Sequence, residues 1–231
     1  MKKSIMAAML LIASLATSSA VMAQSASDSP ISLDSWETVK FSYSSSTLEF
    51  DNIYDIDDMD FNVFSFEYLE GYNIVDNKPV FLEWGIGAEV MNMKDEESAY
   101  IDGTSISAET RTTMVDFYIP VNIGYKLAIN NNTTIMPYVG IKAQLNIFGE
   151  EEMKVSAGTY SEEETIDLFD KKDMGSNTLK HGWLGWHIGA TVERNNWSIG
   201  VRYGKSITDE FFNKIDDCKL SSVTVSVGYF F

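Results

Sequence analysis

The 231-residue chain has one cysteine, two histidines and no long apolar run after its first two dozen residues. A single thiol cannot form an intramolecular disulfide, so a disulfide-stabilised fold is excluded. We place Cys218 in a polar loop. Without a run of about 20 apolar residues after the N-terminal segment, the rest of the chain has no candidate transmembrane helix. Basic residues are also scarce: the net charge of −17 disfavours nucleic acid as a partner.

The N-terminal segment has the features of an export signal. Two lysines precede an apolar run that ends near Ala16, and small residues follow up to Ala23. This order is typical of a secretory signal peptide, and the apolar run is too short for a membrane anchor. We therefore expect a cleaved signal peptide over 1–23, a flexible lead-in over 24–38 and one domain over 39–231.

Most of the remaining chain alternates apolar and polar side chains. Near the C-terminus, Val223 and Val225 fall on one face, and Thr224 and Ser226 fall on the other. Strict period-two alternation is typical of a strand with one apolar and one polar face. The same pattern predicts eight strands, over residues 39–48, 61–72, 80–91, 112–127, 135–147, 183–193, 197–205 and 220–231.

The connections between these strands alternate in length. Three short turns lie near Asn77, Asn131 and Asn195, and the longer connections carry most of the acidic residues. We predict that the two longest, over 92–111 and 148–182, are polar loops. Outer-membrane barrels have an even number of antiparallel strands, short periplasmic turns and longer outside loops. The pattern therefore predicts an all-β, eight-stranded antiparallel up-and-down transmembrane β-barrel with long acidic extracellular loops.

A soluble lipocalin-like barrel is the alternative, with its apolar face inside. The charged residues favour the membrane barrel, because they share one face of the strands with many glycines. Paired charges and glycines can fill the narrow lumen of a small barrel. Unpaired charges there would be costly, so we predict a network of paired charges. Its predicted members are Lys40, Glu67, Glu83, Glu89, Asp116, Lys126, Lys142, His187, Glu193 and Arg202.

Arg202 lies in the middle of its predicted strand. It should therefore contact at least one carboxylate of the polar face. The candidates are Glu83, Glu89, Asp116 and Glu193.

The apolar face carries aliphatic residues in mid-strand and aromatic residues toward the strand ends. An apolar band between two aromatic girdles is typical of outer-membrane barrels. The predicted girdle residues are Phe41, Tyr125, Trp183, Trp197, Tyr203, Tyr229 and Phe231.

Several segments resemble a known family, the small OmpA/OmpX-like barrels, and most closely the PorT-type outer membrane protein β-barrel domain common in Bacteroidetes. The resemblance implies an address in the bacterial outer membrane, in contact with its lipids and lipopolysaccharide. It also implies a C-terminal assembly signal at Val227, Tyr229 and Phe231, recognised by the barrel-assembly machinery. The segments that carry it are FYIPVNIGYKL, PYVGIKAQLNIFG, WHIGATVERNNWSIGVRYGKS and VTVSVGYFF.

The sequence offers few candidates for catalysis or metal binding. His181 is expected to be solvated, and His187 to be a structural histidine of the lumen, so no general base is assigned. The acidic run that includes Asp55 and Asp60 lacks the central Gly and closing Glu of an EF-hand. We expect no cofactor and no metal site.

These observations predict a non-enzymatic barrel with a structural or surface-interaction role. The first alternative is a small-solute channel or a ligand-binding transport barrel. A lipid-modifying enzyme of the outer membrane, or a soluble lipocalin-like barrel, comes third.

Overall fold

The structure is a computed structural model that describes residues 35–50, 58–75, 79–101, 104–130, 132–174, 178–208 and 218–231. The chain divides into two units, Met1–Ser35 and Trp36–Phe231, and the second contains the barrel. The expected signal peptide lies outside the described residues. Strand β1 (Ser35–Phe50) begins before the predicted start at Val39, so the end of the predicted lead-in is part of a strand.

In strand β10 (Cys218–Phe230), the alternation in sequence becomes an alternation across the sheet. Val223 and Val225 are 60% and 51% exposed, whereas Thr224 between them is 3% exposed. The apolar face therefore points outward and the polar face inward. This is the reverse of the lipocalin arrangement, and it confirms the predicted membrane barrel.

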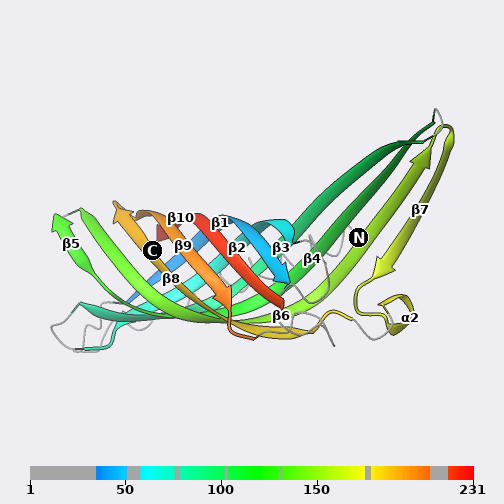
Figure 1. The fold of residues 1–231 in the computed structure, drawn as a ribbon. Coiled ribbons are helices and arrows are strands. Elements are labelled where there is room, and N and C mark those ends of the chain that lie inside the picture. The colour runs from blue at the N-terminus through cyan, green and yellow to red at the C-terminus, as the bar shows by residue number, and fades with distance from the viewer. Residues whose placement is uncertain are drawn as a thin grey trace. The chain divides into compact units, whose positions relative to one another are not determined.

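Within the described residues, eight antiparallel strands hydrogen-bond in a closed ring, in the order β1, β2, β3, β4, β6, β8, β9, β10 (Figure 1). The seam joins β10 to β1, in register from Thr38 opposite Phe230 to Phe50 opposite Cys218. Closure pairs the backbone groups that a bilayer cannot hydrate. The other ring strands are β2 (Met59–Asn73), β3 (Val80–Ile101), β4 (Thr104–Tyr125), β6 (Thr133–Ala157), β8 (Gly182–Arg194) and β9 (Trp197–Ser206).

The turn between β8 and β9 is as tight as its sequence predicts. Asn195 and Asn196 have φ angles of 50° and 69°, in the left-handed region that asparagine tolerates. Two successive positive φ angles are typical of a two-residue hairpin whose twist matches its strands. Of the other two predicted short turns, Asn77 and Asn131 lie outside the described residues.

Six of the seven predicted girdle residues do lie on the outer face, but Trp183 does not. It is 7% exposed and packs inside the barrel with residues such as Leu179 and Leu220. Trp183 lies two residues before the inward-facing Gly185 in β8, so its side chain also points inward. Strand alternation therefore overrides the preference of Trp for the membrane–water interface. The outward residues, between 38% and 69% exposed, are Phe41, Tyr125, Trp197, Tyr203, Tyr229 and Phe231.

Two apolar clusters lie inside the barrel, one at each end of its strands. One contains Trp36 and Phe230, and the other contains Leu48 and Cys218. Cys218 is 1% exposed at the start of β10, so its predicted place in a polar loop is wrong. In the part of the chain that the structure describes, no helix is both long enough and apolar enough to cross a membrane.

The two longest predicted loops are largely strands, which corrects the sequence prediction. Residues 92–111 continue β3 and β4 as one long hairpin. Much of 148–182 forms the end of β6, strand β7 (Tyr160–Asp167) and a short helix α2 (Lys171–Met174). Side chains of both faces are largely exposed in β7 and mostly exposed or half-exposed in the continued parts of β3, β4 and β6. The sequence of these segments therefore lacks the apolar alternation by which strands are recognised.

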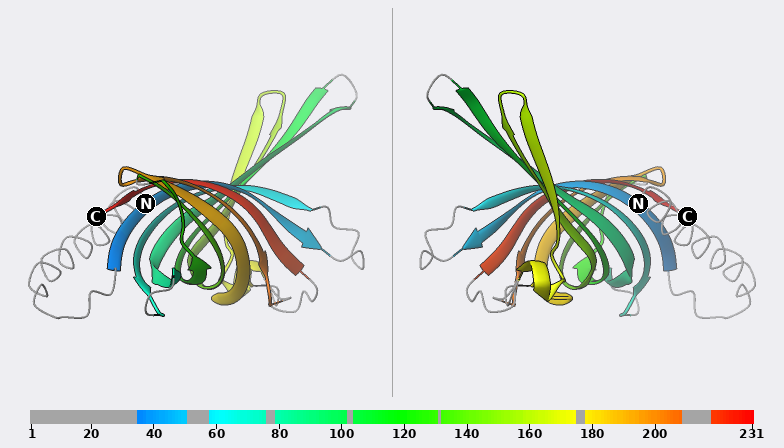
Figure 2. Two further views of the ribbon diagram at one scale, coloured as in Figure 1. Left: turned by 90° about the vertical axis from the view of Figure 1, so that its left-hand side faces the viewer. Right: turned by 90° about the vertical axis from the view of Figure 1, so that its right-hand side faces the viewer.

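These segments form a four-stranded sheet that we call the extension. The last register pair between β2 and β3 is Asn62 with Asn92, and beyond it β3 continues with β4, β4 with β6, and β6 with β7. Figure 2 shows its two hairpins, β3–β4 and β6–β7, projecting from the same side of the ring. The extension comprises β3 from Met93, β4 up to Thr113, β6 from Gly149, and β7.

Candidate functional site

The polar faces of the ring strands line the interior of the barrel. Inward-facing charged residues come from strands far apart in sequence, because each strand contributes every second side chain. Six of the predicted network residues are at most 5% exposed: Lys40, Glu67, Glu83, Glu89, Asp116 and His187.

Three ion pairs cross the interior. Lys40 Nζ lies 3.2 Å from Glu83 Oε1, and Lys142 Nζ lies 3.2 Å from Glu89 Oε2. The third pair joins Arg202 Nη1 to a carboxylate oxygen at 2.8 Å. Each pair joins two different strands, so each compensates for charge burial and also ties the barrel wall together.

The partner of Arg202 is Glu67, which was not among the carboxylates predicted for it. Period-two alternation assigns both residues to the interior, but it does not give their height along the barrel. Glu67 on β2 and Arg202 on β9 are separated in the ring by β1 and β10. The long arginine side chain reaches across the lumen to a strand that is not its neighbour.

Neutral side chains extend these pairs into a network. Tyr118 donates its hydroxyl hydrogen to Glu67 Oε1 at 2.9 Å, and Asn122 Nδ2 donates to Glu83 Oε1 at 2.9 Å. Asn122 Oδ1 in turn lies 2.5 Å from His187 Nε2. Tyr118 and Asn122 alternate in step with Asp116, so both lie on the inward face of β4. This alternation is the signal by which the sequence could have included them in the predicted network.

Gln144 on β6 joins two further carboxylates. Its Nε2 donates to Glu89 Oε1 at 2.6 Å and to Asp116 Oδ2 at 2.7 Å. Glu89 also contacts Lys142, so this cluster joins β3, β4 and β6. Among the described residues, no Lys, Arg or His forms an ion pair with Asp116.

Lys126 and Glu193 lie apart from the network. Lys126 follows the end of β4, and its Nζ lies 3.4 Å from the ring centroid of Trp36, a cation–π geometry. Glu193, near the end of β8, is half-buried and forms no ion pair with any described residue. Lys126 therefore contacts Trp36 at one end of the strands, and within the described ranges Glu193 is ion-paired to none of the other charges.

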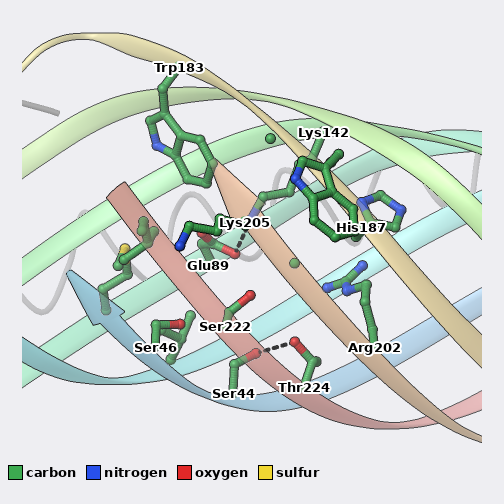
Figure 3. A pocket seen from close by; sticks show the side chains of 16 residues that line it. Ser44, Ser46, Glu89, Lys142, Trp183, His187, Arg202, Lys205, Ser222 and Thr224 are labelled. Atoms are coloured by element: carbon green, nitrogen blue, oxygen red, sulfur yellow. Dashed lines mark hydrogen bonds and ion pairs between the residues drawn. The ribbon is translucent and has the colours of Figure 1, made fainter. Parts of the chain in front are cut away.

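A small cavity opens beside the network (Figure 3). Its volume is about 30 Å³, and its lining includes Lys142, Trp183 and Arg202. One wall is the seam between β1 and β10, where the hydroxyl oxygens of Ser44 and Thr224 lie 2.8 Å apart. A water molecule needs roughly 10–15 Å³ of such space, so the cavity has room for about two.

The other candidate sites are separate from this network. His181 is exposed and stacks on Phe169, with ring centroids 4.6 Å apart. Asp60 accepts a hydrogen bond from Thr47 Oγ1 at 2.7 Å, whereas Asp55 lies outside the described residues. Within the described ranges, no three His, Cys, Asp or Glu side chains are grouped so as to hold a metal ion.

Comparisons with known proteins agree with this architecture. A family model described as "Outer membrane protein beta-barrel domain" matches residues 9–231. No curated protein matches the chain.

Solved structures with a similar arrangement share little sequence with this chain. Ail, the attachment invasion locus protein of Yersinia pestis, is 16% identical, with 85% of this chain and 98% of Ail covered and a TM-score of 0.33. Neisserial surface protein A is 12% identical, with 84% and 96% covered and a TM-score of 0.38. The outer membrane enzyme PagL is 13% identical, with 81% and 98% covered and a TM-score of 0.30.

The family match includes every strand of the ring and the extension. The family expected from the sequence is thereby confirmed at the level of the outer-membrane barrel, and its PorT-type subtype stays a prediction. The closed ring has an apolar exterior and an ion-paired interior, as a spanning barrel requires. The chain therefore belongs to the outer membrane protein beta-barrel domain family and is a protein of the bacterial outer membrane.

Proposed function

We propose that this protein is a non-enzymatic barrel that acts through its surface, with the extension as its interaction platform. The observation that carries the proposal is that β3, β4 and β6 continue beyond the residue pairs that close the ring. Strand β7 joins them there as a fourth strand. A barrel that served only to span the membrane would not need these residues. The ring fixes the extension at its base and so limits its freedom.

The two faces of the extension differ in charge. In the β3–β4 and β6–β7 registers, Asp95 lies opposite Thr110, and Glu164 lies opposite Met153. These positions continue the inward-facing parity of the ring strands. Among the described residues of this inner face, acidic side chains have no basic neighbour. The acidic residues are Asp95, Glu97, Glu151, Glu162 and Glu164.

The outer face carries the basic residues, and two of them, Lys94 and Arg111, are ion-paired there. Lys94 Nζ lies 3.4 Å from Glu96 and 3.5 Å from Glu109, and Arg111 forms an ion pair with Glu109. Slight desolvation acts to raise the pKa of Glu109, but the hydrogen bond and charge of Arg111 hold that pKa below its usual value. The unneutralised inner face is therefore the side that would attract a cationic partner.

The lumen supports a closed barrel over the channel alternative. Its mid-section is filled by cross-lumen ion pairs, and the cavity beside them has room for about two waters. An eight-stranded barrel has an interior just wide enough for its side chains. The enzyme alternative is less favoured because His187 is buried and its Nε2 is engaged by Asn122.

The test compares two triple variants of equal charge change. The inner-face variant carries Glu151→Gln, Glu162→Gln and Glu164→Gln, and its control carries the outer-face changes Glu150→Gln, Glu152→Gln and Glu163→Gln. Each is reconstituted in neutral lipid vesicles, and binding of a fluorescent lysine-rich peptide is measured by anisotropy. We expect at least a several-fold loss of affinity in the inner-face variant only.

Equal losses in the two variants would mean that the peptide senses net charge rather than one face. Equal affinity in all three proteins would remove the extension as an electrostatic platform.

A further inference from the structure

Asp116 is the most buried carboxylate of the lumen, with 0% exposure. On β4 it lies directly between Glu89 on β3 and Asn146 on β6 in the sheet register. Its Oδ2 accepts a hydrogen bond from Gln144 at 2.7 Å, and its Oδ1 has no hydrogen-bond partner within the described part of the chain. An ionised carboxylate in this position needs more compensation than one amide hydrogen provides.

The charges of the inner network do not balance around Asp116. Each of the three cations that form cross-lumen ion pairs is bonded to another carboxylate: Lys40 to Glu83, Lys142 to Glu89, and Arg202 to Glu67. His187 contacts Asn122 instead. Within the network as described, one negative charge is left in excess, and it belongs to Asp116.

Two neighbouring side chains also present oxygen atoms without donors. Gln144 Oε1 and Asn146 Oδ1 are buried, and no described residue donates a hydrogen bond to either. The nitrogen ends of both amides are already used: Gln144 Nε2 donates to two carboxylates, and Asn146 Nδ2 donates to the backbone oxygen of Lys180 at 2.6 Å. Exchanging the amide oxygen and nitrogen would therefore remove these bonds, so the unpartnered atoms are acceptors.

Three acceptor oxygens from one buried cluster, together with one uncompensated negative charge, have the chemistry of a cation site. Carboxylate and amide oxygens are ligands for hard cations rather than for soft transition metals. A single positive charge would neutralise the network, whereas a divalent ion would reverse its sign. We propose that Asp116, Gln144 and Asn146 bind one monovalent hard cation, sodium, inside the barrel.

The experiment measures unfolding of the whole protein by urea in lipid vesicles, followed by tryptophan fluorescence. Sodium chloride is replaced stepwise by choline chloride, so that ionic strength stays constant while the small cation is removed. A single bound sodium predicts that the folded-to-unfolded ratio rises tenfold for each tenfold rise in sodium once the site is largely filled. The choline series needs no variant and shows whether a small cation stabilises the folded protein.

Two variants locate the effect. Asp116→Asn removes the charge at constant size and should abolish the sodium dependence. Glu163→Gln, on the outer face of the extension, removes one charge far from the lumen and should leave the dependence intact. A sodium dependence that persists in Asp116→Asn would overturn this site.

Two other outcomes would also overturn the proposal. Stability that rises on acidification but ignores sodium would mean that Asp116 holds a proton. Stability that responds to neither would mean that water alone serves the three oxygens.

Discussion

At the scale of single residues, Arg202 and Glu67 form a buried ion pair that a neutral side chain also supports. Their side chains are 12% and 3% exposed, and Glu67 also accepts the hydroxyl hydrogen of Tyr118. Removing one partner of a buried pair leaves the other charge without compensation, which costs more than removing both. The contact therefore has a testable asymmetry.

Arg202→Met should destabilise the barrel by about 3 kcal/mol, because Glu67 would remain buried and ionised. Adding Glu67→Gln should recover most of this loss, since the neutral amide can still accept the hydrogen bond from Tyr118. Urea unfolding in lipid vesicles measures all three proteins. A silent single change would show that water reaches the pair, and it would strengthen the case for a channel.

Gly140 is a second lumen residue at which an added side chain should be destabilising. A Cβ atom there would collide with Asn122 Oδ1 and His187 Nε2 and would lie 2.6 Å from the backbone oxygen of Val121. Gly140→Ala should therefore cost about 2 kcal/mol, as overpacking of a filled interior does.

Gly204→Ala is the matched control for Gly140→Ala. Its added carbon would come no closer than 3.2 Å, to the hydroxyl of Ser222, which can rotate away. Unfolding midpoints should fall clearly in Gly140→Ala and little in Gly204→Ala. Similar midpoints would mean that the wall around Asn122 and His187 relaxes freely.

At the scale of elements, β10 closes the ring and presents the C-terminal aromatic residues outward. Val227, Tyr229 and Phe231 are 50%, 38% and 69% exposed, and the rings of Tyr229 and Phe231 lie 5.3 Å apart. The backbone N–H of Phe231 donates to the carbonyl oxygen of Glu37 at 2.9 Å. The terminal residue therefore adds one bond to the seam, while its ring stays free for recognition.

Phe231→Ser should reduce the amount of protein in the outer membrane several-fold without reducing export, because its ring resembles the signal for barrel assembly. Phe41→Ser is the control, since it removes another exposed outward aromatic residue. Immunoblots of outer-membrane and periplasmic fractions measure both variants. Equal levels of the two would assign Phe231 to the lipid interface alone.

At the scale of the whole molecule, the ion-paired lumen and the small cavity predict a barrel without a steady aqueous path. Purified protein in planar bilayers should show no stable conductance step above background at moderate salt. The Arg202→Met variant provides the contrast, because it removes the side chain that crosses the lumen from β9 to β2. Regular single-channel steps in the unaltered protein would instead favour the small-solute channel.

The exterior of the ring gives a second prediction at this scale. Spin labels at Ile199, Val201 and Val225, which are 67%, 56% and 51% exposed, should be reached by oxygen and shielded from an aqueous relaxation agent. A label at Ser161, in the extension, should show the opposite preference. Collision with the aqueous agent at all four positions would contradict the position of the ring in the bilayer.

The sequence by itself determined which side chains face in and which face out. Strict alternation in Val223–Phe231 and the asparagine pair at 195–196 are local signals, because strand pleat and turn geometry depend on a few adjacent residues. For the same reason, eight ring strands and the inward positions of the lumen charges could be predicted. Trp183 faces inward, as strand alternation predicts, although its residue type suggested the aromatic girdle.

Tertiary structure decided which inward-facing residues contact one another, because strand alternation gives only the face of each side chain. The stagger of the strands around the ring sets the height of each side chain, so it paired Arg202 with Glu67 and gave Asp116 no ion-pair partner among the described residues. Pairing between distant strands also turned polar segments into the extension, which has no apolar face to mark it in the sequence. Contacts of this kind depend on closure of the whole ring, and that information is not contained in any single stretch of the chain.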